Sequence, residues 1–198
     1  MAKQLNWLQV DRFLRQRGLN LFSPRDLRHL LGASELSARF LLTRATKRGD
    51  VLKLRRELYT LPDQPASDLE IANRLYPPSY ISFEYALAYY HLIPESVYEV
   101  TSATTRTSRR FDVLGKGFTY RRLKRAAFTG YRPERVDGRV VLIAEPEKAM
   151  MDSLYFASLG LLALPERLDA TQLRRDRLVA WAALYQRPQL VEQMGANQ

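Results

Sequence analysis

The hydrophobic residues follow a helical spacing in the first part of the chain and a strand spacing after Val97. Up to residue 48 they recur every three or four positions, which predicts amphipathic helices over residues 4–17, 24–31 and 34–48. After Val97 they alternate with polar residues, and this predicts five short strands, in residues 97–105, 111–115, 118–123, 126–132 and 139–145. Helical spacing returns after Glu145. The pattern predicts an α+β protein with a small, partly antiparallel sheet in its second part.

Capping residues mark the ends of the second and third predicted helices. Ser23 can accept a hydrogen bond from a free backbone N–H, and Pro24 suits the first helical position. Gly32 can end this helix in the left-handed conformation. Ser34 can then cap the longer helix, which ends near Gly49. Two helices joined by so short a break predict a helix-turn-helix.

The segment from Val51 to Leu61 predicts a basic two-stranded hairpin with Arg55, Arg56 and Glu57 at its tip. Helix, turn, helix and basic hairpin is the order of a winged helix-turn-helix. In that arrangement the second helix of the motif enters the major groove, and its outward side chains meet the edges of the bases. The first part of the chain is therefore predicted to be a DNA-binding winged helix-turn-helix.

Candidate DNA-binding residues follow from the two faces of helix 34–48. If Ala38, Ala45 and either Leu41 or Leu42 face the core, the polar and basic residues face outward. Arginine is suited to bidentate reading of guanine, hydroxyl groups can donate or accept, and cations on the hairpin would lie near phosphates. The candidates are Ser34, Ser37, Arg39, Phe40, Thr43, Arg44, Lys47, Lys53, Arg55 and Arg56. The alternative interpretation is a solvated basic helix and hairpin that does not bind nucleic acid.

The positive charge lies in two separate blocks. The chain has a net charge of +10, which favours an anionic partner. Residues 1–65 hold 13 Lys and Arg against 6 Asp and Glu, and residues 105–138 hold 10 against 3. Residues 66–104 are acidic, with 1 against 5. The winged helix-turn-helix accounts for the first block only, so the second block needs a function of its own: either a charged solvent face of a half-buried sheet, or a face that binds an acidic partner or nucleic acid.

Composition excludes several classes of protein. The 198 residues include no cysteine, which excludes disulfides, thiolate metal sites and a cysteine nucleophile. No apolar run approaches the roughly 18 residues that span a bilayer, and the N-terminus lacks the apolar core of a signal peptide. We therefore expect a cytoplasmic protein.

A proline-containing segment, residues 61–68, separates the two parts of the chain. It holds Pro62 and Pro65 among Asp, Gln and Ser residues, a composition typical of linkers. A short helix is predicted after it, up to Leu75, and another begins near Phe83. The predicted organisation is a winged helix-turn-helix domain in residues 1–62, a linker in residues 63–68 and an α+β domain in residues 69–198.

Signals for an enzyme are weak. Glu145 and Lys148, with Asp112 or Asp137 on neighbouring strands, could form a nuclease-like cluster around Mg²⁺. The chain has no glycine-rich phosphate loop, nucleophile elbow or metal-binding histidine pair, so we expect no catalytic residue, metal or cofactor. Lys148 and Asp152, four positions apart on a helix, are expected to form a surface ion pair of small energetic value.

Three segments after the winged helix-turn-helix carry a resemblance to a known family. They are PSYISFEYALAYYHLIPE, VYEVTSATTRTSRRFDVLGKGFTYRRLK and IAEPEKAMMDSLYF. In this order the chain resembles the AbiEi-type antitoxins of type IV toxin–antitoxin systems, which act in abortive infection as a defence against phage. The likeness extends from the first helix to about Leu161. Members of the family usually have glycine after the basic pair of the wing, where this chain has Glu57.

The resemblance implies two activities. The winged helix-turn-helix would bind inverted repeats in promoter DNA and repress its own operon, and the second domain would counteract a nucleotidyltransferase-type toxin. The positive face of the second domain would be the antitoxin surface, which transfers to Arg109, Arg110, Lys116, Arg121, Arg122 and Lys124. From the residues alone, a stand-alone regulator whose second domain binds a ligand or DNA remains an alternative, and a Mg²⁺-dependent nuclease is a less favoured one.

Overall fold

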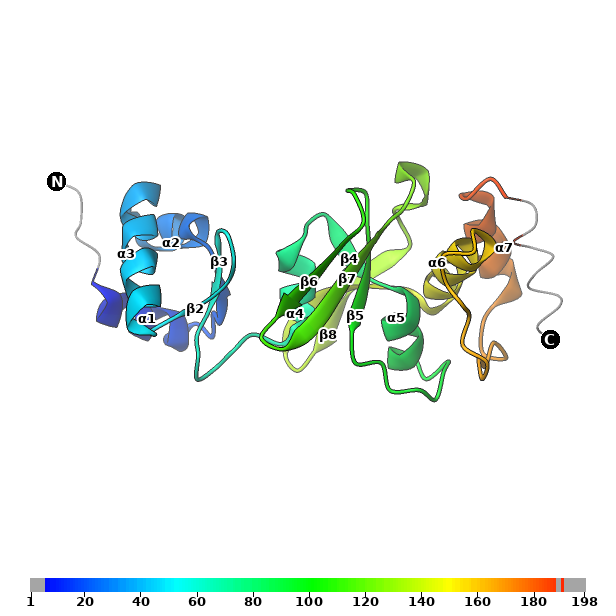
Figure 1. Cartoon of the computed structure of the whole chain (residues 1–198), viewed down its shortest axis with the longest axis horizontal. Helices are drawn as coiled ribbons and strands as arrows, with labels where there is room; N and C mark the ends of the chain where they lie inside the picture. The colour runs from blue at the N-terminus through cyan, green and yellow to red at the C-terminus, as the bar shows by residue number, and fades with distance from the viewer. Residues whose placement is uncertain (1–5, 188–189, 191–198) are drawn as a thin grey trace. The chain divides into compact units, whose positions relative to one another are not determined.

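Two sheets, each with its own helices, make up the computed structural model, which describes residues 6–187 and residue 190 (Figure 1). The chain divides into two compact units, one ending at Leu75 and the other beginning at Tyr76. We refer to them as unit 1 and unit 2. The α+β fold class predicted from the sequence is confirmed.

Three helices form the core of unit 1: α1 (Trp7–Gln16), α2 (Pro24–Leu31) and α3 (Glu35–Arg48). The predicted caps are present. The Ser23 hydroxyl accepts a hydrogen bond from the Asp26 N–H at 3.2 Å, while the Asp26 carboxylate accepts from the Ser23 N–H at 2.8 Å. Gly32 ends α2 in the left-handed conformation, with φ of 65°. The three helices bury a common hydrophobic core that includes Val10, Leu14, Leu27, Ala38, Leu42 and Leu61.

A three-stranded antiparallel sheet completes the winged helix-turn-helix. Its strands are β1 (Leu21–Phe22), β2 (Leu52–Arg55) and β3 (Leu58–Thr60), in the order β1-β3-β2. The β2–β3 hairpin pairs Arg55 with Leu58, so Arg56 and Glu57 form its turn. Glu57 has φ of 65°, in the left-handed region that glycine adopts most easily. The predicted basic hairpin is confirmed.

Helix α4 (Asp68–Leu75) belongs to unit 1. The Arg74 guanidinium donates to the Leu21 carbonyl at 3.2 Å and forms an ion pair with Asp26, and Arg55 donates to the carbonyl of Leu75. These bonds tie α4 to the winged helix-turn-helix. Unit 1 therefore ends one helix after the segment 63–68 that the sequence suggests as the linker.

Unit 2 is built on a mixed six-stranded sheet in the order β6-β7-β5-β4-β9-β8. Neighbouring strands are antiparallel except for β5 with β7 and β4 with β9, which are parallel. The strands are β4 (Ser79–Ile81), β5 (Val100–Thr104), β6 (Arg109–Val113), β7 (Lys116–Arg122), β8 (Tyr131–Val136) and β9 (Arg139–Ala144).

The sheet differs from the sequence prediction in two places. The pattern missed β4, because three residues are too few to show an alternation. The fourth strand predicted, residues 126–132, is wrong over its first part: Arg125–Ala127 form a 3₁₀ helix, η1, and β8 begins only at Tyr131.

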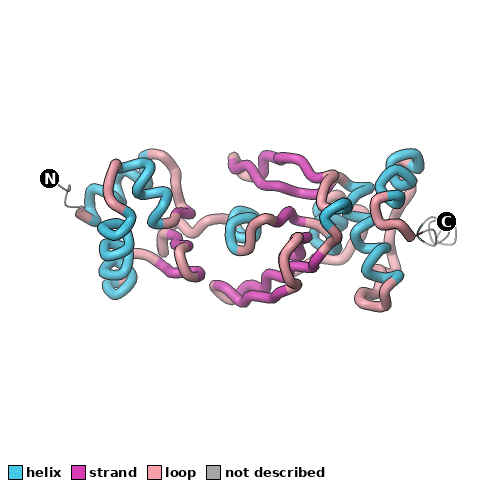
Figure 2. The backbone as a smooth tube through the Cα atoms, turned by 90° about the horizontal axis from the view of Figure 1, so that it is seen from above, coloured by secondary structure: helices cyan, strands magenta, loops and turns pink. Residues whose placement is uncertain are grey.

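Over the part of unit 2 that the structure describes, three α-helices accompany this sheet: α5 (Phe83–Tyr89), α6 (Pro146–Ser158) and α7 (Arg175–Ala183). Figure 2 shows them gathered at one end of the strands. Helix α5 packs on β5 and on α6, and α6 also packs on α7. Helix α6 is largely buried, since ten of its thirteen residues have little or no surface accessible to solvent.

Candidate nucleic-acid interface

Helix α3 presents one face to the core and the other to solvent. Ala38, Leu42 and Ala45 are completely buried, and Leu41 nearly so. The predicted inward face is therefore confirmed, and both leucines belong to it. The side chains on the opposite face are exposed or half-buried, which leaves them available to a ligand of α3.

Ser34 and Ser37 lie at the N-terminal end of α3. The Ser34 hydroxyl donates to the Ser37 hydroxyl at 2.8 Å and accepts from the Ser37 N–H at 3.1 Å. The Ser34 hydroxyl therefore caps the helix, and the Ser37 hydroxyl accepts a hydrogen bond from it. Thr43, further along, donates its hydroxyl to the carbonyl of Arg39 at 2.9 Å.

Arg39 joins α3 to the wing. Its guanidinium forms ion pairs with Glu35 on the same helix at 2.8 Å and with Glu57 in the β2–β3 turn at 3.0 Å. All three side chains are about two-fifths exposed, so water and salt screen these pairs. The two carboxylates hold the guanidinium between the helix and the hairpin. Sequence spacing indicates the pair with Glu35 but not the pair with Glu57.

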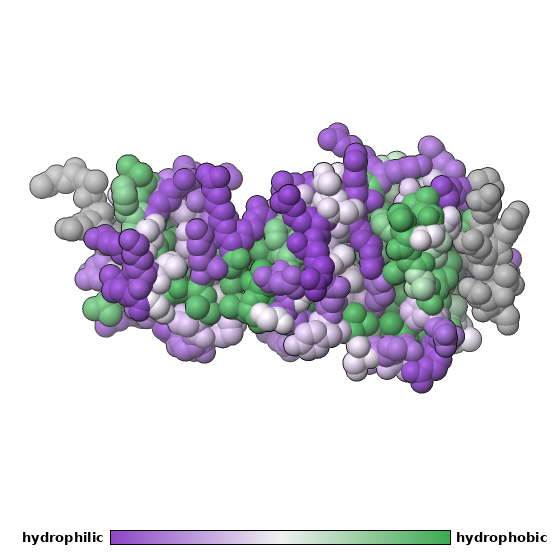
Figure 3. All heavy atoms as spheres, viewed as in Figure 1, coloured by the Kyte–Doolittle hydropathy of each residue, from purple (hydrophilic) through white to green (hydrophobic). Residues whose placement is uncertain are grey.

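Phe40 is the large aromatic residue of the exposed face, with 59% of its surface accessible. Leu36, one helical turn earlier, is 63% accessible and was not among the residues predicted from the sequence. Its spacing of four from Phe40 is the signal that could have identified it. Figure 3 shows a hydrophobic patch over the N-terminal end of α3, with hydrophilic side chains around it.

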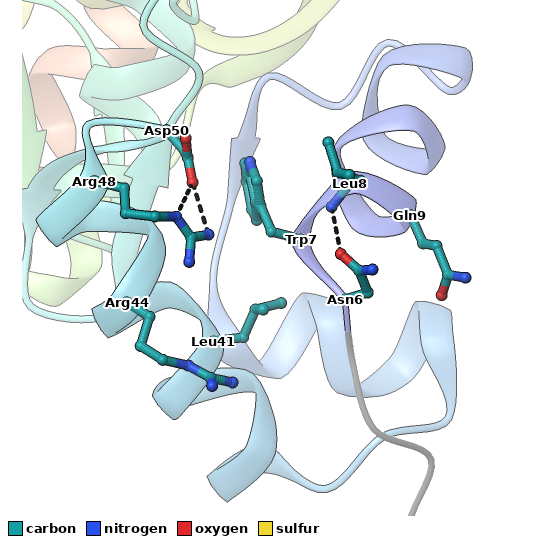
Figure 4. Close-up of a pocket in the computed structure, with 8 residues that line it drawn as sticks. All are labelled: Asn6, Trp7, Leu8, Gln9, Leu41, Arg44, Arg48 and Asp50. Carbon is teal, nitrogen blue, oxygen red and sulfur yellow. Dashed lines mark hydrogen bonds and ion pairs between the residues drawn. The ribbon is translucent and has the colours of Figure 1, made fainter.

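Arg44 and Lys47 lie toward the C-terminal end of α3, and both are exposed. Arg44 contributes to a groove of about 730 Å³ beside the start of α1, together with Trp7, Leu41 and Arg48 (Figure 4). Arg48 is paired with Asp50 at 2.7 Å, whereas Arg44 has no ion-pair partner among the described residues. The Arg44 guanidinium is therefore available for an anion or for a base.

The three predicted cations of the wing differ in their surroundings. Lys53 and Arg56 are exposed, as contacts with phosphates require. Arg55 is half-buried and donates to the carbonyl of Leu75, so it also has a structural role. The wing thus presents two exposed cations, and its turn contacts α3 through the Arg39–Glu57 pair.

The six basic residues predicted as the antitoxin surface lie in and after the β6–β7 hairpin of unit 2, on both faces of the sheet. Side chains alternate along a strand, so Arg109, Lys116 and Arg122 lie on one face and Arg110 and Arg121 on the other. Lys124 follows the end of β7 and is exposed.

Carboxylates already engage some of these cations. Arg121 is half-buried, forms a two-pronged ion pair with Glu84 at 2.6 and 2.9 Å, and lies 4.8 Å from the centre of the Phe83 ring. Arg110 pairs with Glu99 and Asp112, each at 2.7 Å. Among the described residues, Arg109, Arg122 and Lys124 form no ion pair, so they are the predicted cations most available to a partner.

The nuclease-like cluster considered from the sequence includes Lys148, which is completely buried and paired with Asp152. Asp112 lies on β6, at one edge of the sheet, whereas Asp137 lies in the β8–β9 turn at the opposite edge. Within residues 6–187, no group of three or more histidine and carboxylate residues is arranged to hold a metal ion.

Lys148 and Asp152 form an ion pair, but the prediction that it lies on the surface is wrong: both side chains are completely buried. Asp152 accepts hydrogen bonds from Lys148, from the Tyr185 hydroxyl, from Ser82 at 2.6 Å and from Tyr80 at 3.1 Å. Lys148 also donates to the Tyr185 hydroxyl at 2.6 Å. This buried network joins α6 to β4, to the residue that follows β4 and to Tyr185, which comes just after α7.

Burial shifts the pKa values in this network. It lowers the pKa of Lys148, an effect that the neighbouring Asp152 partly offsets. It raises the pKa of Tyr80 and of Tyr185 well above 10, and the charge of Asp152 adds to the rise. The network has no access to solvent, so its groups serve to hold the elements of unit 2 together.

Two packed helices joined by a short turn, a third helix and a basic hairpin define unit 1 as a winged helix-turn-helix. Residues 9–62 match the family model described as "Transcriptional regulator, AbiEi antitoxin". Over these residues the chain is therefore similar to the AbiEi antitoxin family of transcriptional regulators.

No curated protein matches the chain. Among the helices of the described residues, none combines the length and the apolar character that crossing a bilayer requires.

Proposed function

We propose that the protein is the antitoxin of a type IV toxin–antitoxin system and that it represses its own operon by binding promoter DNA. The family match over residues 9–62 carries the proposal. Two features support the DNA-binding part: the exposed face of α3 with Arg44 and Lys47, and the exposed cations Lys53 and Arg56 on the wing. Unit 2 would counteract a nucleotidyltransferase-type toxin.

The DNA-binding part is tested with the full-length chain and the promoter fragment of its own operon. We expect specific binding that weakens with rising salt, because cations that neutralise phosphates release counterions. Arg44→Ala should weaken specific binding by about 1–3 kcal/mol if Arg44 reads a base. Lys53→Ala should instead weaken binding to all sequences alike and make the salt dependence less steep. Equal binding of the promoter and of random duplex would contradict the proposal.

The antitoxin part is tested by co-expression with the neighbouring gene, with growth and co-purification as readouts. The variant to use replaces Arg109, Arg122 and Lys124 with Glu, because these cations have no ion pairs to lose among the described residues. Arg121 is a poor choice, since its replacement would also break its partly buried ion pair with Glu84. We expect loss of rescue with promoter binding unchanged.

Arg135→Glu is the matched control for this experiment. Arg135 is an exposed cation on β8, at the edge of the sheet away from β6 and β7. Arg135→Glu should leave the rescue of growth intact. Full rescue by the triple variant would exclude this surface.

A second candidate function follows from the extent of the family match, which ends before α4. Unit 2 lies outside it, so a stand-alone regulator whose unit 2 binds a ligand or DNA is the competing proposal. A neighbouring gene that encodes a nucleotidyltransferase and is toxic without this protein favours the antitoxin. Growth that does not depend on this protein favours the regulator.

A further inference from the structure

The exposed face of α3 has a hydrophobic centre. Leu36 and Phe40, one helical turn apart, are 63% and 59% accessible, although each could have been polar without disturbing the core. Large apolar side chains so exposed on a soluble helix often mark a contact surface. The pair lies on the helix that the winged helix-turn-helix arrangement presents to the major groove.

Most hydrogen-bonding groups around this pair are already engaged. The Ser34 and Ser37 hydroxyls bond to each other, and Arg39 is held by Glu35 and Glu57. Thr43 gives its hydroxyl to the helix backbone, which leaves its methyl group for any ligand. The N-terminal two-thirds of this face therefore offers mainly apolar contacts.

Charge indicates what such a face contacts. Arg44 and Lys47 follow the apolar pair on the same helix, and Lys53 and Arg56 lie on the wing. Cations around an apolar centre are complementary to a polyanion that presents an apolar group between its phosphates. In the DNA major groove that group is the C5-methyl of thymine, which apolar side chains, phenylalanine among them, contact directly.

We infer that Leu36 and Phe40 read the C5-methyl groups of thymine, so that this face of α3 specifies A·T pairs by methyl contact. The inference rests on the DNA-binding part of the proposed function and adds the identity of the bases. Arg44, toward the other end of the helix, is then left to contact a different base or a phosphate.

The test measures binding of the full-length chain to a duplex selected from a random pool by that chain. Each thymine of the selected duplex is replaced in turn by deoxyuridine, which removes the methyl group and keeps the base pair. We expect a loss of about fourfold in affinity at one or two positions, the factor that follows from losing the burial of one methyl group. Phe40→Ala should bind more weakly and no longer distinguish thymine from deoxyuridine at one of these positions.

Three further variants make the outcome specific. Arg44→Ala should bind more weakly but keep the preference for thymine over deoxyuridine. Phe40→Leu should keep part of the affinity and part of this preference, because leucine is also apolar. Val179→Ala, at an exposed hydrophobic residue of α7, should change nothing. Circular dichroism and sedimentation of each variant show whether it is folded and in the same oligomeric state as the parent.

The outcomes separate the inference from the proposed function. Sequence-specific binding that is indifferent to every thymine methyl overturns the inference and leaves DNA binding intact. The inference is also overturned, with DNA binding left intact, if Phe40→Ala dissociates an oligomer while the preference for thymine persists. The apolar pair is then a contact between copies of the chain. Failure to select any sequence from the pool overturns both.

Discussion

Helices α3 and α6 each carry an ion pair at a spacing of four residues, and the two pairs lie in opposite environments. Glu35 and Arg39 on α3 are both more than a third exposed, whereas Lys148 and Asp152 on α6 are completely buried. An exposed pair of this kind contributes about 0.2–1 kcal/mol. Breaking a buried pair costs several times more, because it leaves an uncompensated charge away from water. Spacing thus predicts that the two side chains are in contact, but not how much their contact contributes to stability.

The difference comes from what surrounds each helix. The outward side of α3 faces solvent, so water and salt screen the charges of Glu35 and Arg39. The polar side chains of α6 are buried and meet three hydroxyls: those of Tyr80 on β4, of Ser82 directly after β4 and of Tyr185 just after α7. The pair on α3 therefore adds little to the stability of unit 1, whereas the buried network holds α6 to its neighbours in unit 2.

The largest effect is expected for Asp152→Ala. It leaves the Lys148 ammonium buried without its carboxylate, which should lower the free energy of unfolding by about 3–5 kcal/mol in urea titrations. The double variant Lys148→Met, Asp152→Leu removes both charges and should recover most of this loss, since apolar replacements of a buried pair are often close to neutral. Asp176→Ala, which breaks an exposed pair with Arg174, is the matched control and should have no measurable effect. If Asp152→Ala and Asp176→Ala lower the free energy of unfolding equally, burial does not make the ion pair on α6 more important for stability than an exposed one.

Gly130→Ala is expected to be the next most destabilising change. Gly130 has φ of 73°, and a Cβ there would lie 2.9 Å from the Cγ of Lys148 and 3.0 Å from the Trp181 ring. The left-handed backbone alone costs an alanine about 1–2 kcal/mol, and the contact adds to it. Gly138→Ala, at φ of 76° with open space around it, has the backbone cost only. The melting temperature of Gly130→Ala should therefore be lower than that of Gly138→Ala. The reverse order would show that Lys148 and Trp181 move away from the added Cβ at little cost.

High pH should weaken unit 2 through the tyrosines of the buried network. Burial raises the pKa of Tyr80 and Tyr185 above 10, so above this pH the folded chain keeps protons that the unfolded chain loses. Stability then falls as pH rises. Lys148 has the opposite effect on stability, because burial lowers its pKa and the unfolded chain then keeps a proton that the folded chain loses. Its stabilising contribution stops growing near pH 10.5, where the unfolded lysine also loses its proton.

The measurement is the free energy of unfolding in urea above that pH. Tyr185→Phe should reduce the slope by about 1.4 kcal/mol per pH unit, the value for one proton. Tyr98→Phe, at an exposed tyrosine, should leave the slope unchanged. Identical slopes in all three proteins would mean that Tyr185 ionises in the folded state as it does in the unfolded chain.

The smallest effect is expected for Glu35→Gln on α3. It weakens one of the two carboxylate contacts of Arg39 and should change the free energy of unfolding by less than about 1 kcal/mol. The helix cap at Ser34 stays in place, so circular dichroism should show no loss of helix. A loss comparable to that of Asp152→Ala would mean that the pair on α3 is as essential to folding as the buried one.

The features that the sequence predicts well are local ones. Ser23 with Asp26, Gly32 and Ser34 each act within one turn of helix, so their neighbours in the chain are their partners in space. The inward face of α3 follows from periodicity for the same reason. The predicted residues of the candidate site are therefore largely exposed, as their positions on the helix and the hairpin require.

The features that the sequence does not predict depend on distant partners. Lys148 is buried because Tyr185 and Tyr80 come from other parts of the chain, and Arg39 meets Glu57 only once the hairpin folds back on α3. Strand β4 is too short to be detected alone and exists through its pairing with β5 and β9. Leu36 is exposed as its helical position implies, but a leucine there is indistinguishable from a core residue until the packing of the helix is known.

The parallel pairing of β4 with β9 has a consequence for the order of events during translation. Every strand of unit 1 finds its partner before Leu75, so its contacts are complete while the ribosome is still making the rest of the chain. Ile81 on β4, by contrast, must wait for Ile143 on β9 before the centre of its sheet can close. A nascent chain thus carries all residues of the winged helix-turn-helix well before unit 2 is made, and a product terminated between the units would retain unit 1 alone.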